Sequence, residues 1–128
     1  MAGPAKLRLE LFVANIATAR RFYVSVLGFE AGPEGYGGYT PVSRGGIHLA
    51  FNSNDQLPDD NPVKVASGDR PGRGVEIVIE VGDIEALYAH VQASGWPISS
   101  ELASHPWGLS DFRIIDPDGY YLRISTPG

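Results

Sequence analysis

The chain has 128 residues, of which 43% are hydrophobic and 20% charged, which excludes a disordered chain and predicts one compact domain over residues 1–128. Ten Lys and Arg stand against fifteen Asp and Glu, for a net charge of -5. Because there is also no basic run to follow a phosphate backbone, we expect no nucleic-acid partner. The absence of cysteine excludes disulfides, thiolate metal sites and cysteine nucleophiles.

The N-terminal segment lacks the features of a targeting signal. Residues 1–11 mix Lys, Arg and Glu with Leu and contain no long apolar core of the kind a signal peptide needs. No stretch of the sequence approaches the roughly 20 apolar residues of a membrane span. We therefore expect a cytoplasmic protein with no membrane partner.

The first half begins with an alternating segment followed by an amphipathic one. Residues 7–13 alternate with a period of two, which predicts a strand with one apolar face. Asn15 is a candidate N-cap for a helix whose apolar residues recur at helical spacing from Ile16 to Leu27. Gly28 follows as a C-terminal stop. The pattern predicts a strand, a turn and a helix.

This pattern recurs in the second half of the chain. Residues 75–81 alternate again, Asp83 occupies the cap position, and Gly95 ends the predicted helix. The offset between the two copies is 68 residues at the caps and 67 residues at the stop glycines. An internal duplication is the simplest explanation.

Shorter strand-like segments follow each predicted helix. They cover residues 36–42, 47–51, 98–102, 111–115 and 120–125. Asp116-Pro117-Asp118-Gly119 is a hairpin-turn sequence between the last two. Residues 53–73 are rich in Asp, Asn, Pro, Gly and Ser, which predicts a polar connector. We therefore divide the domain into module one (6–52), the connector (53–73) and module two (74–127).

The alternation also predicts which strand residues face the helices. Leu49, Phe51 and Leu122 fall on the helix side of their strands, and the opposite, inner side collects charged and aromatic residues. One interpretation is a lined groove between two curled half-sheets, the usual setting of a small-molecule site. The other is a solvent face whose charges pair with one another.

Four motifs occur in a characteristic order on this duplicated frame. They are Phe22-Tyr23 with Leu27-Gly28-Phe29, the segment 83–95, Pro106-Trp107-Gly108, and Asp116-Pro117-Asp118-Gly119-Tyr120. In these motifs the chain resembles the vicinal oxygen chelate superfamily, which includes glyoxalase I, bleomycin and fosfomycin resistance proteins and extradiol dioxygenases. The resemblance implies an α+β fold of two βαβββ modules forming a curled mixed sheet around a cleft. That cleft is often completed by a dimer partner, so we expect a homodimer.

The resemblance also implies where a metal would bind. In the superfamily's metal enzymes the first and last strands of each module each supply one ligand, and these positions fall on Arg8, His48, Glu76 and Arg123. A guanidinium has no free lone pair, so the two arginines are not ligands and we expect no metal cofactor. We expect Arg8 to pair with Glu76 or with Glu10 instead. A divalent metal held by His48, Glu76 and Glu80 remains the alternative.

In losing these metal positions, the chain resembles the bleomycin-resistance branch of the superfamily, whose members sequester an antibiotic without catalysing a reaction. The predicted function is therefore binding of a small molecule in the cleft. The predicted ligand-binding residues are Arg8, His48, Glu76, Trp107, Tyr121 and Arg123. Arg8 and Arg123 could equally receive an anion. His105 is a weaker candidate, in a loop beside Trp107.

Two other functions stay open at this stage. The chain could be a divalent-metal lyase, isomerase or dioxygenase, or a metal-free acid–base catalyst in which His48 and Glu76 move the proton. It could also be a structural module without a ligand. Several aromatic residues are candidates for stacking on a ligand, although Phe51 and Phe112 fit the core better: Phe12, Tyr36, Tyr39, Phe51, Trp107, Phe112 and Tyr121.

Overall fold

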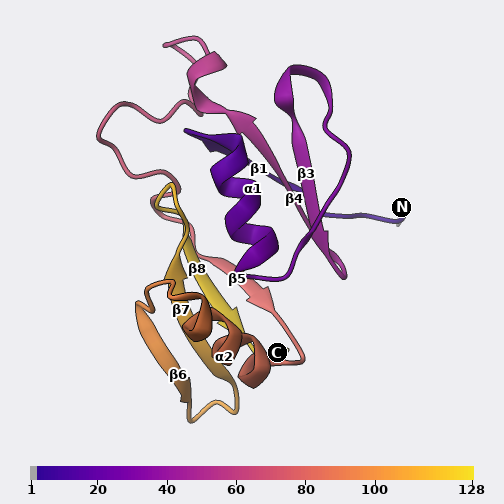
Figure 1. Cartoon of the computed structure of the whole chain (residues 1–128), viewed down its shortest axis with the longest axis vertical. Helices are drawn as coiled ribbons and strands as arrows, with labels where there is room; N and C mark the ends of the chain where they lie inside the picture. The colour runs from indigo at the N-terminus through magenta and orange to yellow at the C-terminus, as the bar shows by residue number, and fades with distance from the viewer. Residues whose placement is uncertain (1–2) are drawn as a thin grey trace.

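A computed structural model describes residues 3–128 and contains two sheets and two main helices. The elements of module one are β1 (Leu9–Val13), α1 (Ile16–Ser25), β2 (Glu30–Ala31), η1 (Tyr36–Gly38), β3 (Thr40–Arg44) and β4 (Ile47–Ser53). A short turn, η2 (Asn54–Gln56), begins the connector. Module two contains β5 (Ile77–Glu80), α2 (Ile84–Ser94), β6 (Ser100–Ser104), β7 (Ser110–Ile115) and β8 (Tyr121–Ser125). The two modules lie one above the other in Figure 1, joined by the long connector.

Both sheets have the same topology. The strand orders are β1-β4-β3-β2 and β5-β8-β7-β6, with the first strand of each module parallel to the last and the other pairings antiparallel. The predicted α+β fold of two βαβββ modules is confirmed. The sheets remain two separate four-stranded sheets and do not close around a cleft within this chain.

The two helices begin differently despite the duplication. The Asn15 side chain accepts a hydrogen bond from the Thr18 amide at 2.9 Å, so the predicted N-cap is confirmed. Asp83 occupies the N-cap position of α2, as predicted, but its side chain makes no capping hydrogen bond. Both carboxylate oxygens of Asp83 instead accept from Arg44 Nη2 at 3.0 Å. A charge-assisted bond to the guanidinium replaces the weaker bond to a backbone amide.

Two strand predictions differ from the structure. The strand expected at residues 36–42 begins only at Thr40, because Gly37 and Gly38 have φ angles of 67° and 86° that turn the chain into η1. β6 runs from Ser100 to Ser104, two residues later than expected. β2 is two residues long and gave no periodic signal in the sequence.

The hydrophobic core lies between the helices and the sheets. Phe51, Leu122 and Ile124 are fully buried, as the alternation predicts. The modules also pack on each other: the rings of Phe22 and Trp96 have centroids 4.6 Å apart. These contacts place both modules in one hydrophobic cluster. Burying the Phe22 side chain contributes about 1.5 to 3 kcal/mol to stability.

Within residues 3–128, neither helix combines the length and the apolar composition that crossing a bilayer requires.

Candidate functional site

The inner face of the first sheet carries one ion pair. Arg8 Nε lies 2.7 Å from Glu10 Oε2, which decides between the two partners expected for this arginine. Glu10 also accepts from Asn52 Nδ2 at 2.9 Å and from the Tyr39 hydroxyl at 3.2 Å. Partial burial raises the pKa of Glu10, but the three hydrogen bonds outweigh it and leave the pKa below its usual range. His48, also on this sheet, is exposed.

The inner face of the second sheet carries a denser charge cluster. Glu76 Oε2 accepts from Arg113 Nε at 3.0 Å, and Glu76 Oε1 lies 3.2 Å from Arg123 Nε. The nearby Glu76 carboxylate raises the pKa of the Arg113 guanidinium. The Nε atom of Arg123 is buried and lies close to Glu76. Even so, its N–H makes no hydrogen bond, because no acceptor within residues 3–128 is aligned with it. Arg113 was not among the residues predicted from sequence.

Asp111 extends this cluster toward the loop before β7. Its side chain is only 3% exposed and lies 3.8 Å from Nη1 of both Arg113 and Arg123. Its Oδ1 lies 2.8 Å from His105 Nε2. The His105 ring stacks on Trp107, with centroids 4.5 Å apart and an interplanar angle of 6°. The buried carboxylate therefore connects the arginine pair to an exposed aromatic platform.

The predicted ligand-binding residues divide between the two sheets. Glu76 and Arg123 are in contact, and Trp107 joins them through His105 and Asp111. Tyr121 packs under Arg70, whose guanidinium carbon lies 5.8 Å from the ring centroid. His48 lies on the first sheet and Arg8 directly before its strand β1, and within residues 3–128 no hydrogen bond or ion pair connects them to the others.

The alternative metal site is not assembled within the described chain. Glu80 accepts from the Gly128 amide at 3.1 Å, Glu76 faces its two arginines, and His48 lies on the other sheet. Across residues 3–128, no group of three or more His, Asp or Glu side chains is placed to hold a metal ion.

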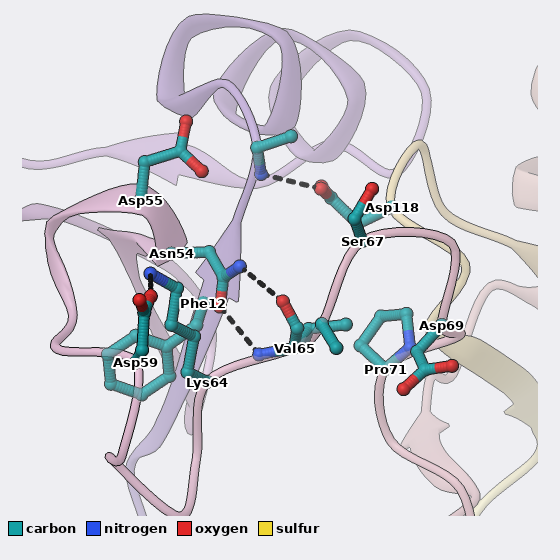
Figure 2. Close-up of a pocket in the computed structure, with 12 residues that line it drawn as sticks. Phe12, Asn54, Asp55, Asp59, Lys64, Val65, Ser67, Asp69, Pro71 and Asp118 are labelled. Atoms are coloured by element: carbon teal, nitrogen blue, oxygen red, sulfur yellow. Dashed lines mark hydrogen bonds and ion pairs between the residues drawn. The ribbon is translucent and has the colours of Figure 1, made fainter.

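The connector forms one wall of a pocket at the end of β1 (Figure 2). The pocket has a volume of about 660 Å³. Asn54 pins the connector by bonding both the amide and the carbonyl of Val65 at 2.9 Å, and the Asp118 carboxylate accepts from the Ala14 amide at 2.7 Å. The lining residues are Phe12, Ala14, Asn54, Asp55, Asp59, Lys64, Val65, Ala66, Ser67, Asp69, Pro71 and Asp118. The segment expected to be a plain linker thus folds back over the end of β1.

The aromatic residues predicted to stack on a ligand lie in different environments. Phe51 and Phe112 are fully buried core residues, as their alternation indicated. Phe12 lines the large pocket, whereas Tyr36 is fully exposed and Trp107 is 64% exposed. Trp107 therefore combines a fixed orientation, set by His105, with an accessible ring face.

The chain is similar to one known protein family over most of its length. The model of the Glyoxalase/Bleomycin resistance protein/Dioxygenase superfamily matches residues 7–124. No curated protein matches the chain.

Among solved structures, an integron cassette protein from the mobile metagenome of V. cholerae is 25% identical, with a TM-score of 0.72 over 100% of this chain and 98% of that one. TnmS3, an antibiotic binding protein from Streptomyces sp. CB03234, is 21% identical, with a TM-score of 0.72 over 100% and 99% of the two chains. A lactoylglutathione lyase from Agrobacterium tumefaciens is 17% identical, with a TM-score of 0.71 over 98% and 96%. The last two likenesses concern the fold alone.

Proposed function

Since the chain belongs to the Glyoxalase/Bleomycin resistance protein/Dioxygenase superfamily, we propose that it binds a small, partly aromatic molecule along its inner sheet faces without a catalytic metal. The observation that carries this proposal is the environment of Glu76, whose carboxylate oxygens lie 3.0 and 3.2 Å from the Nε atoms of Arg113 and Arg123. At this position the charges of the protein satisfy one another.

The residues present do not fit the metal that the superfamily implies. A catalytic zinc takes three protein ligands with free lone pairs, and Arg8 and Arg123 have none to offer. The remaining candidates are Glu76, whose oxygens face guanidinium groups, and the exposed His48. A cation placed here would also meet the positive charge of two arginines, which disfavours its binding.

Several features support small-molecule binding. Trp107 offers an exposed ring held by its stack on His105, and indole rings supply large contact areas for flat ligands. Phe12 connects the inner face of the first sheet to a pocket of about 660 Å³, a size within the range of ligand pockets. The fold likeness to TnmS3 agrees with this function.

We propose a homodimer as the assembly that completes the cleft. The two sheets do not close around a cleft in one chain, and Val78, on the inner face of β5, is 43% exposed. A second copy laid on this face would cover Val78 and bring two inner faces together. Light scattering of the eluted protein should give twice the chain mass, and Val78→Asp should give the monomer mass.

Tryptophan fluorescence tests the binding proposal. The wild type is titrated with a panel of glycopeptide and aromatic antibiotics, in parallel with Trp107→Phe, which leaves only Trp96 as a reporter. Trp96 is half-buried and donates to the Ile115 carbonyl at 2.8 Å, so it serves as the internal control. We expect a saturable change in the wild type that is lost in Trp107→Phe. Silence of the wild type across the panel would contradict the proposal.

His48 separates this function from the catalytic alternative. Acid–base catalysis by His48 and Glu76 requires the imidazole, whereas binding through Trp107 and the arginines does not. We expect His48→Ala to leave the fluorescence titration unchanged. Any turnover that disappears in His48→Ala would favour the enzyme.

A further inference from the structure

Two arginines stand directly opposite each other on the inner face of the second sheet. Arg113 of β7 and Arg123 of β8 are partners in the antiparallel register. Like charges in this position repel each other, so the pair needs counter-charges. Glu76 supplies one at the Nε side of both guanidinium groups, and Asp111 supplies the other. The arginine pair is therefore held in place by the fold.

The outer edges of both guanidinium groups remain available. Within residues 3–128, no hydrogen bond uses an Nη nitrogen of Arg113 or Arg123, because Asp111 lies 3.8 Å from each Nη1, beyond hydrogen-bond distance. The two side chains are 26% and 29% exposed, so they are partly fixed by packing yet reach solvent. Oriented guanidinium forks with unused N–H groups suit the oxygens of a carboxylate or phosphate.

The surroundings of the pair carry an excess of positive charge. A pocket of about 360 Å³ beside Tyr121 is lined by Arg70 and Arg73 and by no carboxylate. Arg70 is oriented by a hydrogen bond of 2.8 Å from its Nε to the Gly119 carbonyl. The two carboxylates Glu76 and Asp111 balance Arg113 and Arg123, and Arg70 and Arg73, which line the pocket beside Tyr121, add positive charge. In a chain with a net charge of -5, this face attracts anions.

Aromatic surface borders the same arginines on both sides. Trp107 is tied to the pair through His105 and Asp111. Tyr121 lies two residues from Arg123 on the same face of β8, about 6 to 7 Å along the strand. Rings on both sides of a cationic centre fit a ligand that carries both a flat ring and an acidic group.

We infer that the inner face of the second sheet, between Trp107 and Tyr121, binds an aromatic molecule bearing a carboxylate or phosphate, whose oxygens contact the Nη groups of Arg113 and Arg123. This inference rests on the proposed function and names its ligand class. Arg113 and Arg123 bind the anion, while Glu76 and Asp111 position the two guanidinium groups.

Calorimetric titration with four naphthalene derivatives tests this inference, since they share one ring system and differ in charge. The probes are 2-naphthoate, 2-naphthyl phosphate, neutral 2-naphthamide and cationic 2-naphthylmethylamine. We expect the two anions to bind at least about tenfold more tightly than the amide and the amine, as expected for charge-assisted hydrogen bonds. The ratio of the two anion affinities distinguishes a carboxylate site from a phosphate site.

Lysine variants test the role of the guanidinium forks. Arg113→Lys and Arg123→Lys keep the charge that Glu76 requires but lose the paired donors, and circular dichroism confirms that they fold. We expect each to weaken anion binding about tenfold or more. Arg20→Lys, on the exposed surface of α1, is the matched control and should bind as the wild type does.

The outcomes separate this inference from the function on which it rests. If both lysine variants bind the anions like the wild type, or if the amide or the amine binds as tightly, the inference is wrong while small-molecule binding stands. If no naphthalene probe binds but an antibiotic changes the Trp107 fluorescence, the inference also fails alone. Absence of binding in both experiments contradicts the inference and the proposed function together.

Discussion

In module one, as far as residues 3–128 show, the inner sheet face carries one ion pair, between Glu10 of β1 and Arg8, which lies directly before β1. The arginine side chain is 62% exposed. In module two the same face carries two arginines, two carboxylates and a histidine, drawn from two strands, a strand edge and a loop. Its central carboxylate, Asp111, is 3% exposed. The ion pairs of the two faces therefore contribute unequally to stability, because a buried charge depends on its partners far more than an exposed one does.

Each module also contacts the other through its own hairpin, but the residues that make the two contacts differ in burial. The β3–β4 hairpin of module one reaches the start of α2 through Arg44 and Asp83, an exposed pair. The β7–β8 hairpin of module two reaches the end of β1 and α1 through buried groups: the Tyr23 hydroxyl donates to Asp116 Oδ2 at 2.8 Å, and the Tyr120 hydroxyl donates to the Phe12 carbonyl at 2.9 Å. Equivalent positions of the repeat therefore contribute unequally to stability.

The largest expected effect comes from removing the buried carboxylate of module two. Asp111→Ala leaves Arg113 and Arg123 with Glu76 as their single counter-charge, and we expect a loss of about 3 to 5 kcal/mol in the free energy of unfolding. Urea denaturation measures it. Arg8→Ala in module one is the control and should leave the denaturation midpoint unchanged, because Glu10 keeps its bonds to Asn52 and Tyr39. Equal losses in the two variants would remove the difference between the modules.

A pH titration of stability probes the junction at Asp116. Burial raises the pKa of Asp116 to about 6, against hydrogen bonds from Tyr23 and the backbone that lower it. Because the folded state then holds the proton of Asp116 more tightly than the unfolded state, the contribution of Asp116 to stability is fully present below pH 4 and is lost as the pH rises through about 6. The loss amounts to about 3 kcal/mol. Asp116→Asn should lack this decline.

Urea midpoints of both proteins between pH 3.5 and pH 7.5 give the comparison. A constant difference between wild type and Asp116→Asn would show that the hydrogen bonds fully offset the burial of the carboxylate, and a wild type that gains relative stability as the pH rises would show that they outweigh it. Either result would contradict the raised pKa of Asp116.

A smaller effect is expected at the other contacts of the junction. Tyr120→Phe removes the hydroxyl that accepts from the Phe12 amide at 3.2 Å and donates to its carbonyl, so two backbone groups lose their partner. We expect a loss of about 1 to 2 kcal/mol. Arg44→Ala breaks the exposed pair with Asp83 and should cost at most about 1 kcal/mol. Thermal unfolding of both variants orders the two contacts, and a larger loss for Arg44→Ala would reverse the ranking.

Much of the frame could be predicted from local patterns. The period-two alternation predicts β1 and the burial of Leu122 and Ile124. Asn15 caps the start of α1 and Gly95 caps the end of α2, as their chemistry indicates. These features depend on neighbours in the sequence. The resemblance in the hairpin and loop motifs supplied the two-module architecture that the family match supports.

The site was harder to predict because it depends on register between distant strands. Arg113 meets Arg123 only through the pairing of β7 with β8, and no periodicity in the sequence shows which residues stand opposite each other. The Asp83 carboxylate binds Arg44 instead of capping α2 with its side chain, and no local pattern predicts this pair because the two residues lie 39 positions apart. The wall that the connector forms over Phe12 depends equally on tertiary contacts, such as that of Asn54 with Val65.

We propose that the chain holds no catalytic metal, because Arg113 and Arg123 face the Glu76 carboxylate. Metal content by mass spectrometry, on protein purified without chelator or affinity tag, tests this claim most directly when Glu76→Ala is measured in parallel. We expect metal well below one ion per chain in both proteins. Nearly one divalent ion per wild-type chain that disappears in Glu76→Ala would contradict the account and place the protein among the metal enzymes.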